Sequence, residues 1–330
     1  MLLSAPAVRV TVALILTGLG CFLSGCSVRP RAVAPRPVRG ASQGFPVTLT
    51  DAQGQRVVVP SPPRRIVSVT PTVTEILFAL DAGGRVVAAT EQCNYPPQAR
   101  GLPRVGGFFT PSTEKALAAA PDLVIGQRGN PPEFIAALRR AGVPVFTISP
   151  QRLQDIYRDV LAIGRITGQT SQAAAVVAGM RERLRAIEGE LASVPGGRRP
   201  SAFIFSQISP VWTAGAGTFQ DDAIRAAGGR NAGASVHGFR EFSTEALLAA
   251  DPDYLVVSTM GGTSTLMKQQ LLASPGLRRL TAVRRNRVIM LDGDELMRPG
   301  PRIVDAIEDM ARVFYPDRFR APASSSTSAR

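Results

Sequence analysis

Few residues of this 330-residue chain could carry acid–base or nucleophilic chemistry. His237 is the only histidine, which excludes multi-histidine metal sites and limits general-base schemes. Neither a G-x-S-x-G nucleophile elbow nor a phosphate-binding Walker loop occurs. Cys93 is a lone thiol, and the acidic turn "DGDE" at 292–295 lacks the pattern of a metal loop and is interpreted as solvated. These residues do not indicate catalysis or metal binding.

One acidic residue does recur in an informative pattern. The stretch "STEKALAAAPDLVI" begins at Ser112, and "STEALLAADPDYLVV" begins at Ser243. Each opens with Ser-Thr-Glu, continues as an Ala/Leu helix, breaks at Pro-Asp and enters an apolar strand. A second landmark, "AGGR", ends at Arg85 before the first copy and at Arg230 before the second. Two matched landmarks in the same order predict a structural duplication.

The third letter of each repeat, Glu114 or Glu245, falls in the first turn of the predicted helix. A serine N-cap and an acid at this position favour the helix dipole by about 0.3–1 kcal/mol, which is a sufficient structural reason for both. A capping box needs the acid three residues after the cap rather than two. The two carboxylates are therefore free to point outward, and a docking role stays open.

Aromatic and polar residues gather where predicted strands end. In open parallel sheets, the ligand crevice lies beyond the carboxyl ends of the strands. The residues expected to contact a ligand lie at these ends and in the loops before the two repeats: Tyr95, Phe108, Phe109, Arg128, Trp212, Phe239, Asp294 and Arg298. An aromatic-lined cleft with a few polar groups suits a large, partly flat ligand. The alternatives are purely structural roles, in which Phe108 and Phe109 anchor a loop and Trp212 caps the core.

The elements that would position these residues follow an α/β pattern. "PVTLT", "DAQGQ" and "RVVVP" predict a hairpin, and short apolar strands then alternate with helices of about a dozen residues. Residues 153–198 are almost entirely helical, including a helix of about 24 residues, roughly 35 Å long. We predict an α/β protein with two pseudo-duplicated lobes, 45–152 and 199–318, each with a central, mostly parallel sheet, joined by one long helix.

Both ends of the chain are expected to lie outside the fold. Residues 1–25 have the charged start and short apolar run of an export signal, too short for a spanning helix. "LSGC" ending at Cys26 resembles a lipoprotein cleavage site, which implies lipidation of Cys26; a plain signal peptide with an incidental cysteine is the alternative. Residues 26–44 are interpreted as a Pro/Arg-rich tether, and 319–330 as a disordered tail.

The formal net charge of +13 does not indicate nucleic-acid binding. Five arginines belong to the signal and tether segments, and an exported protein rarely meets nucleic acid. A basic tether beside anionic lipid head groups is the more natural use of this charge.

The assembled segments resemble the substrate-binding proteins of bacterial ABC importers whose two lobes are joined by one helix. The group serves cobalamin, siderophores, haem and metal ions. The resemblance extends from about residue 46 to 316 and is carried by "RIVSVTPTVTEILFAL", "NYPPQA", "VGGFFTPSTEKALAAAPDLVI" and "PRIVDAIEDMARVF". It is strongest to the cobalamin-binding branch, whose ligand-contacting aromatics fall on Phe108 and Phe239 and whose polar pair falls on Asp294 and Arg298.

Other positions depart from that branch. Gln127 and Ser206 stand where aromatic residues are expected, which leaves a ferric siderophore or another corrinoid open. A haem receptor would offer a tyrosine near the first repeat, whereas Tyr95 lies farther away. A zinc or manganese receptor would need several histidines.

The resemblance implies a non-catalytic, monomeric receptor, exported and anchored to a bacterial membrane by lipid. It would bind a corrinoid between its lobes, without a resident cofactor, and dock through Glu114 and Glu245 onto arginines of a permease dimer. The long helix would restrict hinge bending, so the cleft would be largely pre-formed. The rival from another class is a lipid-anchored α/β hydrolase, for which His237 would have to serve as the base.

Overall fold

The computed structural model describes residues 44–258 and 264–319, which belong to one compact unit. The predicted signal peptide, nearly all of the tether with Cys26, and nearly all of the C-terminal tail lie outside the described residues. Residues 259–263 also lie outside the described residues.

The fold starts with the predicted antiparallel hairpin of β1 (Val47–Thr50) and β2 (Arg56–Val59). Asp51 builds its turn, because Oδ1 accepts hydrogen bonds from the amides of Gln53 at 2.9 Å and Gln55 at 2.8 Å. The alternation of apolar residues and an Asp/Gly turn therefore predicted this element correctly.

The N-terminal lobe contains a four-stranded, all-parallel sheet with the order β4-β3-β5-β6. The strands are β3 (Ile66–Ser68), β4 (Val86–Ala89), β5 (Leu123–Gln127) and β6 (Val145–Ile148). The helices are α1 (Pro71–Ala79), α2 (Thr113–Ala118) and α3 (Pro132–Arg140), with 3-10 turns at Gly83–Arg85 and Pro97–Gly101. The strands are apolar and buried on both faces, as expected where helices cover a parallel sheet.

The C-terminal lobe repeats this arrangement in the order β10-β7-β12-β13, again all parallel. The strands are β7 (Ser201–Phe205), β10 (Arg230–Asn231), β12 (Tyr254–Val257) and β13 (Val288–Met290). The helices are α6 (Phe219–Ala226), α7 (Thr244–Ala250), α8 (Ser264–Ala273), α9 (Thr281–Arg284), α10 (Gly293–Met297) and α11 (Ile303–Phe314). In chain order both sheets are arranged 2-1-3-4, so the predicted pseudo-duplication is confirmed.

The C-terminal lobe also carries a three-stranded antiparallel sheet that the sequence did not predict. It has the order β11-β9-β8, from β8 (Gln207–Ile208), β9 (Val211–Ala214) and β11 (Phe239–Glu241). Trp212, expected at the end of a strand, lies instead within β9 of this sheet. Two- to four-residue strands carry too little periodicity to be recognised, and here the pairing partner lies about 27 residues further along the chain.

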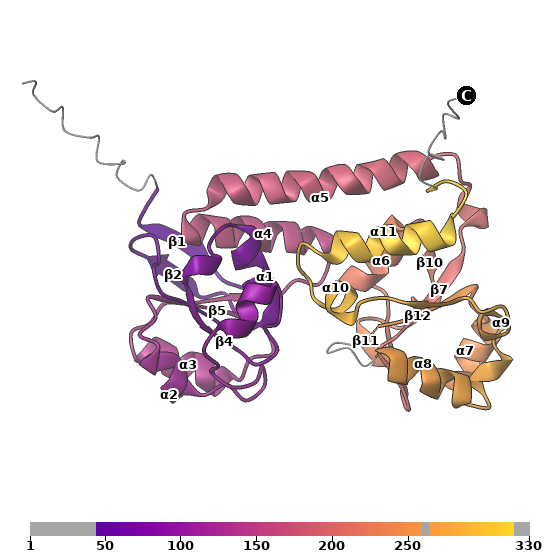
Figure 1. Ribbon diagram of the computed structural model, residues 1–330, viewed down its shortest axis with the longest axis horizontal. Coiled ribbons are helices and arrows are strands. Elements are labelled where there is room, and N and C mark those ends of the chain that lie inside the picture. The colour runs from indigo at the N-terminus through magenta and orange to yellow at the C-terminus, as the bar shows by residue number, and fades with distance from the viewer. Residues whose placement is uncertain (1–43, 259–263, 320–330) are drawn as a thin grey trace, which may run out of the picture. The chain divides into compact units, whose positions relative to one another are not determined.

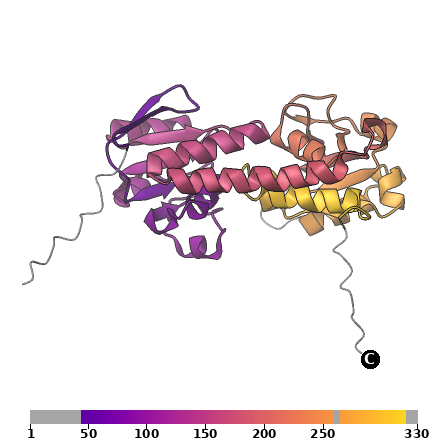
Figure 2. The ribbon, with the colours of Figure 1, turned by 90° about the horizontal axis from the view of Figure 1, so that it is seen from above.

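Two helices join the lobes: α4 (Leu153–Thr167) and the 22-residue α5 (Thr170–Leu191). Gly168 ends α4 with a positive φ of 72°, which lets the chain reverse direction. Helix α5 packs on α4 and also on α6 and α11 of the C-terminal lobe, as Figures 1 and 2 show. A 3-10 turn at Gly196–Arg198 then leads into β7.

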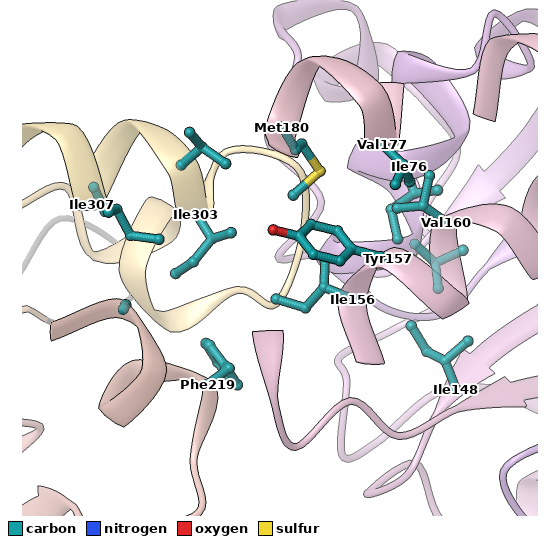
Figure 3. Packing of buried hydrophobic residues seen from close by; sticks show 14 of the residues in the cluster. Ile76, Ile148, Ile156, Tyr157, Val160, Val177, Met180, Phe219, Ile303 and Ile307 are labelled. Atoms are coloured by element: carbon teal, nitrogen blue, oxygen red, sulfur yellow. The ribbon is translucent and has the colours of Figure 1, made fainter. Parts of the chain in front are cut away.

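One hydrophobic cluster is shared by both lobes. It contains Ile76 of α1, Tyr157 of α4, Met180 of α5, Phe219 of α6 and Ile303 of α11 (Figure 3). Each lobe also has a cluster of its own, on β7 and β12 in one and on β5 and α3 in the other. The lobes are therefore tied through a continuous apolar core as well as through the chain connection.

Candidate ligand-binding pocket

The strand order of the N-terminal lobe places a crevice between the carboxyl ends of β3 and β5. The chain leaves β3 for β4 on one side, and β5 lies on the other, so this is the topological switch point where α/β sheets bind ligands. A cavity of about 400 Å³ lies there. Its lining residues are Thr70, Pro71, Thr72, Gln92, Phe108, Phe109, Gln127, Arg128, Gly129, Met297, Arg298 and Pro299.

Of the eight predicted contact residues, four line this cavity: Phe108, Phe109, Arg128 and Arg298. The Phe108 and Phe109 rings meet edge to face, with centroids 4.8 Å apart. Phe108 is half-buried, while Phe109 is 74% exposed, so the pair offers apolar ring surface at the cavity wall. Contact of these residues with a ligand stays a prediction.

Asn130 fixes the position of this aromatic loop. It is buried just beyond β5, and its Nδ2 donates to the carbonyl oxygens of Val69 and Phe108, each at 3.1 Å. Its Oδ1 accepts from the Gln127 amide at 2.9 Å. Gly126 makes room for this side chain, since a Cβ there would lie 2.8 Å from Asn130 Oδ1. Nothing in the local sequence around Asn130 indicates this role.

Gln92 connects the same loop to the C-terminal lobe. Its Oε1 accepts from the Phe108 amide at 3.0 Å, and its backbone oxygen accepts from Arg298 Nη2 at 3.2 Å. The wall of the cavity therefore depends on contacts between the two lobes. Sequence analysis missed Gln92, because nothing in a loop of mixed polar residues distinguishes it.

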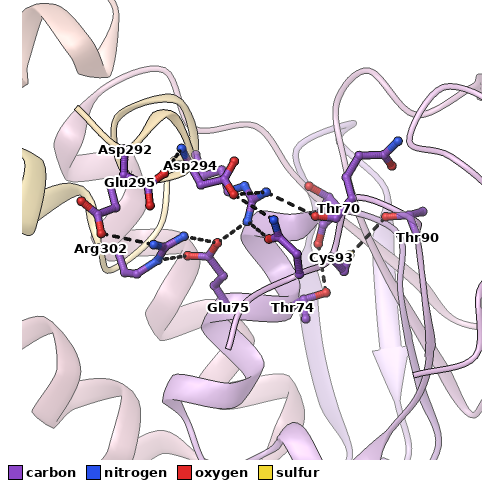
Figure 4. A network of polar contacts seen from close by, with 12 residues as sticks. Thr70, Thr74, Glu75, Thr90, Cys93, Asp292, Asp294, Glu295 and Arg302 are labelled. Atoms are coloured by element: carbon purple, nitrogen blue, oxygen red, sulfur yellow. Dashed lines mark hydrogen bonds and ion pairs between the residues drawn. The ribbon is translucent and has the colours of Figure 1, made fainter. Parts of the chain in front are cut away.

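Arg298 belongs to a buried polar network between the lobes. Its Nη1 donates to Glu75 Oε1 at 2.7 Å and to Asn94 Oδ1 at 2.8 Å, and Nη2 lies 2.9 Å from Asp294 Oδ2. Arg302 donates to the same Glu75 oxygen at 2.9 Å (Figure 4). Glu75 was missed, although a glutamate inside the apolar segment "TVTEILFAL" is the kind of signal that could have revealed it.

This network changes the interpretation of two sequence predictions. Asp294 does not line the cavity; it holds Arg298 and accepts from Asn94 Nδ2 at 3.0 Å. The acidic turn is not simply solvated, because Glu295 pairs with Arg302 at 3.3 Å. The solvated-turn interpretation is wrong because α10 and α11 bring these carboxylates onto arginines that are adjacent only in the folded chain.

The charges within the network shift the pKa values of its members. Burial lowers the pKa of Arg302, but its hydrogen bond to Glu75 and that carboxylate's charge outweigh burial and raise the pKa. Burial and the charge of Asp292 raise the pKa of Glu295. Asp292 itself caps α10, since its Oδ1 accepts from the Asp294 amide at 2.9 Å.

Tyr95 does not line the 400 Å³ cavity. The guanidinium of Arg302 lies 3.9 Å from its ring centroid. Together with Glu75 and Phe78 these residues line a second cavity of about 430 Å³ that does not include Phe108. Tyr95 is therefore not brought together with the aromatic loop.

Trp212 and Phe239 share one face of the small sheet in the C-terminal lobe. In its register Glu241 lies opposite Trp212, and Phe239 lies opposite Ala214, which puts all four side chains on the same side. The rings are 36% and 38% exposed, and neither lines the 400 Å³ cavity. They form a separate exposed aromatic surface.

Cys93 and His237 are the residues that the sequence singles out for possible chemistry. Cys93 is buried, and burial raises the pKa of its thiol, which lies 3.2 Å from Thr90 Oγ1. His237 is exposed. Within residues 44–258 and 264–319, no group of three or more His, Cys, Asp or Glu side chains could hold a metal ion.

The two repeated glutamates occupy equivalent places. Ser112 Oγ accepts from the Lys115 amide at 3.2 Å, and Ser243 Oγ accepts from the Ala246 amide at 3.0 Å, as predicted for N-caps. Glu114 and Glu245 are exposed, and neither forms an ion pair within the described part of the chain. In Figure 1, α2 and α7 lie on the side of the unit opposite α5.

Comparison with known proteins now identifies the class. The chain belongs to the periplasmic binding protein family, whose model matches residues 66–295. It is 29% identical over 306 residues to an uncharacterised ABC transporter substrate-binding lipoprotein, YvrC of Bacillus subtilis, covering 91% of this chain and 95% of that protein. It is 31% identical over 255 residues to a vitamin B12-binding protein of Vibrio cholerae, covering 76% and 89%.

A solved structure shows the same fold. The periplasmic heme-binding protein RhuT from Roseiflexus, in apo form, aligns with a TM-score of 0.70 and 32% identity, covering 77% of this chain and 99% of that chain. The family consists of periplasmic substrate-binding proteins of ABC importers, which are transport proteins rather than enzymes. Among the described residues, none of the helices combines the length and apolar character needed to cross a bilayer.

Proposed function

We propose that this protein is a lipid-anchored receptor that captures a corrinoid between its lobes and delivers it to an ABC permease. The observation that carries the proposal is the cavity at the β3/β5 switch point, walled by Phe108 and Phe109, together with the exposed pair Trp212 and Phe239 on the other lobe. Flat apolar rings and a few polar groups suit a large planar ligand with a polar periphery.

One observation favours a corrinoid over haem, since the similarity to vitamin B12-binding proteins is matched by that to heme-binding RhuT. The side chains of Phe108 and Phe109 have no oxygen or nitrogen to coordinate iron, and Tyr95 lines a different cavity, where its ring contacts Arg302. Heme-binding RhuT is nevertheless a structural relative, so haem and ferric siderophores are the competing ligands to test.

The shared core supports a cleft that is largely formed before the ligand arrives. Helix α5 packs on elements of both lobes, and the buried contact between Arg298 and Glu75 joins them near the cavity. Hinge bending would have to break these contacts, so affinity is expected to depend on pre-organisation more than on closure.

Delivery requires a docking surface and an anchor. Glu114 and Glu245 are exposed carboxylates at equivalent positions of the two lobes, and they suit arginines on the two subunits of a permease dimer. Cys26, outside the described residues, would carry the lipid. A single copy has one docking glutamate for each permease subunit, so the proposed receptor acts as a monomer. It is also proposed to work without a resident cofactor.

The experiment is a ligand titration of the purified protein from residue 44 onward. Cyanocobalamin, haemin and a ferric hydroxamate are compared by calorimetry and by quenching of Trp212, the only tryptophan. Sub-micromolar affinity for cyanocobalamin is expected. Tight binding of haemin or the hydroxamate, with no heat from cyanocobalamin, would move the assignment to that ligand; binding of none of them would overturn it.

A further inference from the structure

The first turn of α1 opens into the 400 Å³ cavity with unused hydrogen-bond donors. Pro71 has no amide proton, and the Thr74 amide donates to the Thr70 carbonyl at 3.1 Å. The amides of Thr72 and Val73 make no hydrogen bond within the described part of the chain. Thr70 does not cap them, since its Oγ1 donates to Gln127 Oε1 at 3.2 Å. Two donors at the positive end of the helix therefore remain free.

The side chain of Thr72 is a second, independent sign of a ligand. Thr72 is only 2% exposed and lines the cavity, and its hydroxyl makes no hydrogen bond to another described residue. Its Oγ1 is not among the fully buried unpartnered atoms, so the oxygen keeps surface that an arriving group can reach. A group arriving in the cavity could satisfy the hydroxyl and the amide of Thr72 together, whereas Val73 does not line the cavity.

The charges around this turn favour an anion. Arg128 is exposed at the rim and makes no ion pair within residues 44–258 and 264–319. Arg298 also lines the cavity, and its Nε is buried without a partner. None of the lining residues carries a carboxylate. The carboxylates that compensate Arg298, Glu75 and Asp294, do not line it.

We propose that the first turn of α1 receives an anionic oxygen group of the ligand, a carboxylate or a phosphate, and that Thr72 is a specificity-determining residue. The amide and hydroxyl of Thr72 would bind its oxygens at the positive end of the helix, with Arg128 neutralising it from the rim. This inference rests on the proposed function for the ligand's identity. A corrinoid can supply the phosphodiester of its nucleotide loop, and haem can supply its two carboxylates.

The test pairs three ligands with four variants. Cyanocobalamin has the phosphodiester, dicyanocobinamide has the same ring without it, and haemin has the carboxylates. Thr72→Val, which removes only the hydroxyl, should weaken binding of an anion-bearing ligand about tenfold, as expected for a hydrogen bond to a charged group. Thr72→Ser should restore binding. Arg128→Gln should weaken binding of the anion-bearing ligand and make that binding less dependent on salt concentration. Gln98→Ala, in the neighbouring cavity, serves as the control.

The pattern across ligands identifies the source of the anion. If Thr72→Val weakens the binding of cyanocobalamin but leaves the affinity for dicyanocobinamide unchanged, the phosphodiester is the bound group. If the substitution weakens the binding of haemin, the bound groups are its carboxylates. Equal affinities of wild type, Thr72→Val and Arg128→Gln for every ligand that binds would overturn the inference.

A readout independent of tetrapyrroles separates this inference from the proposed function. Inorganic phosphate is titrated into the wild-type protein while the amide resonances of Thr72 and Val73 are followed by NMR. Saturable shifts that are lost in Thr72→Val support the anion site even if no tetrapyrrole binds. Absence of any shift in these amides, together with unchanged ligand affinity in Thr72→Val, contradicts it.

Discussion

Arg298 Nη1 donates to Glu75 Oε1 at 2.7 Å, joining residues that are 223 positions apart in the chain and come from different lobes. Both residues are only 4% exposed. A buried ion pair of this kind is weak evidence for net stability, but removing Glu75 would leave Asp294 as the only carboxylate paired with Arg298 within the described residues. The contact lies beside the ligand cavity, so the strength of the junction between the lobes and the shape of the site depend on the same side chains.

Glu75→Gln is expected to destabilise the protein strongly. It removes the carboxylate shared by Arg298 and Arg302. Loss of a buried partner typically costs about 3–5 kcal/mol, and because Asp294 and Glu295 still pair with these arginines, the loss is expected at or below the lower end of that range. The free energy of unfolding is measured by urea denaturation. Asp309→Asn is the matched control, because its ion pair with Arg312 is exposed and should contribute less than about 1 kcal/mol. Similar losses in both variants would contradict the interpretation.

Asn130→Ala should loosen the aromatic loop. It removes three hydrogen bonds that join Val69, Gln127 and Phe108, and we expect a loss of about 1–3 kcal/mol in unfolding free energy. Ligand affinity should fall as well, because Phe108 loses its positioning contact. Thermal unfolding and calorimetry measure the two effects, with exposed Gln154→Ala as control. Reduced stability with unchanged affinity would show that Asn130 acts on the fold alone.

Phe108→Leu and Trp212→Leu should each weaken binding of a planar ligand about 2- to 10-fold, since an aromatic contact is typically stronger than its buried area alone. Both variants keep an apolar side chain, so a loss reflects the ring. Calorimetry measures the affinities, and Val313→Ala, at an exposed apolar position of α11, is the control. An effect of Phe108→Leu without one from Trp212→Leu would confine the ligand to the N-terminal lobe.

Asp159 of α4 should make stability depend on pH. Burial raises its pKa from 3.8 to about 7, with Arg158 opposing and Asp155 adding to the shift. Between about pH 4 and pH 7 the folded protein holds a proton that the unfolded chain releases, so stability falls as pH rises, by at most about 1.4 kcal/mol per unit.

Asp159→Asn should remove the loss of stability that the wild type shows as the pH rises. The variant should have the same unfolding temperature as the wild type near pH 4 and a higher one at pH 8, measured by thermal unfolding across this range. Asp309→Asn, at an exposed position, should show no such pH-dependent gain. An increase in unfolding temperature for Asp159→Asn that is the same at pH 4 and pH 8 would contradict the raised pKa of Asp159.

Glu114→Arg combined with Glu245→Arg should abolish uptake while leaving ligand binding intact. The carboxylates are exposed, and reversing their charge would repel arginines on a permease. Transport into cells is measured beside ligand affinity of the purified variant. Glu182→Arg with Glu190→Arg makes the same charge change on exposed positions of α5 and should transport normally. Loss of ligand binding or folding in the first variant would reject the docking role.

Local pattern was enough to predict the hairpin, the alternating strands and helices, and the two serine-capped helices. Alternation, glycine stops and N-caps are encoded within a few residues of one another, and the repeated "STE" and "AGGR" landmarks revealed the duplication without any contact being known. The same locality explains what was missed. The pairing of β9 with β11 and the roles of Gln92 and Asn130 depend on partners brought close only by folding.

The sequence by itself determined that the chain is a two-lobed α/β protein with one histidine and a glutamate at the same place in each of two repeated helices. Only the tertiary structure decided which strand ends form a cavity, that Tyr95 lies outside it, and that Arg298 is held by Glu75 and Asp294. The physical reason is that hydrophobic periodicity and capping are properties of neighbouring residues, whereas a buried charge is defined by its surroundings. Those surroundings come from segments more than 200 residues apart.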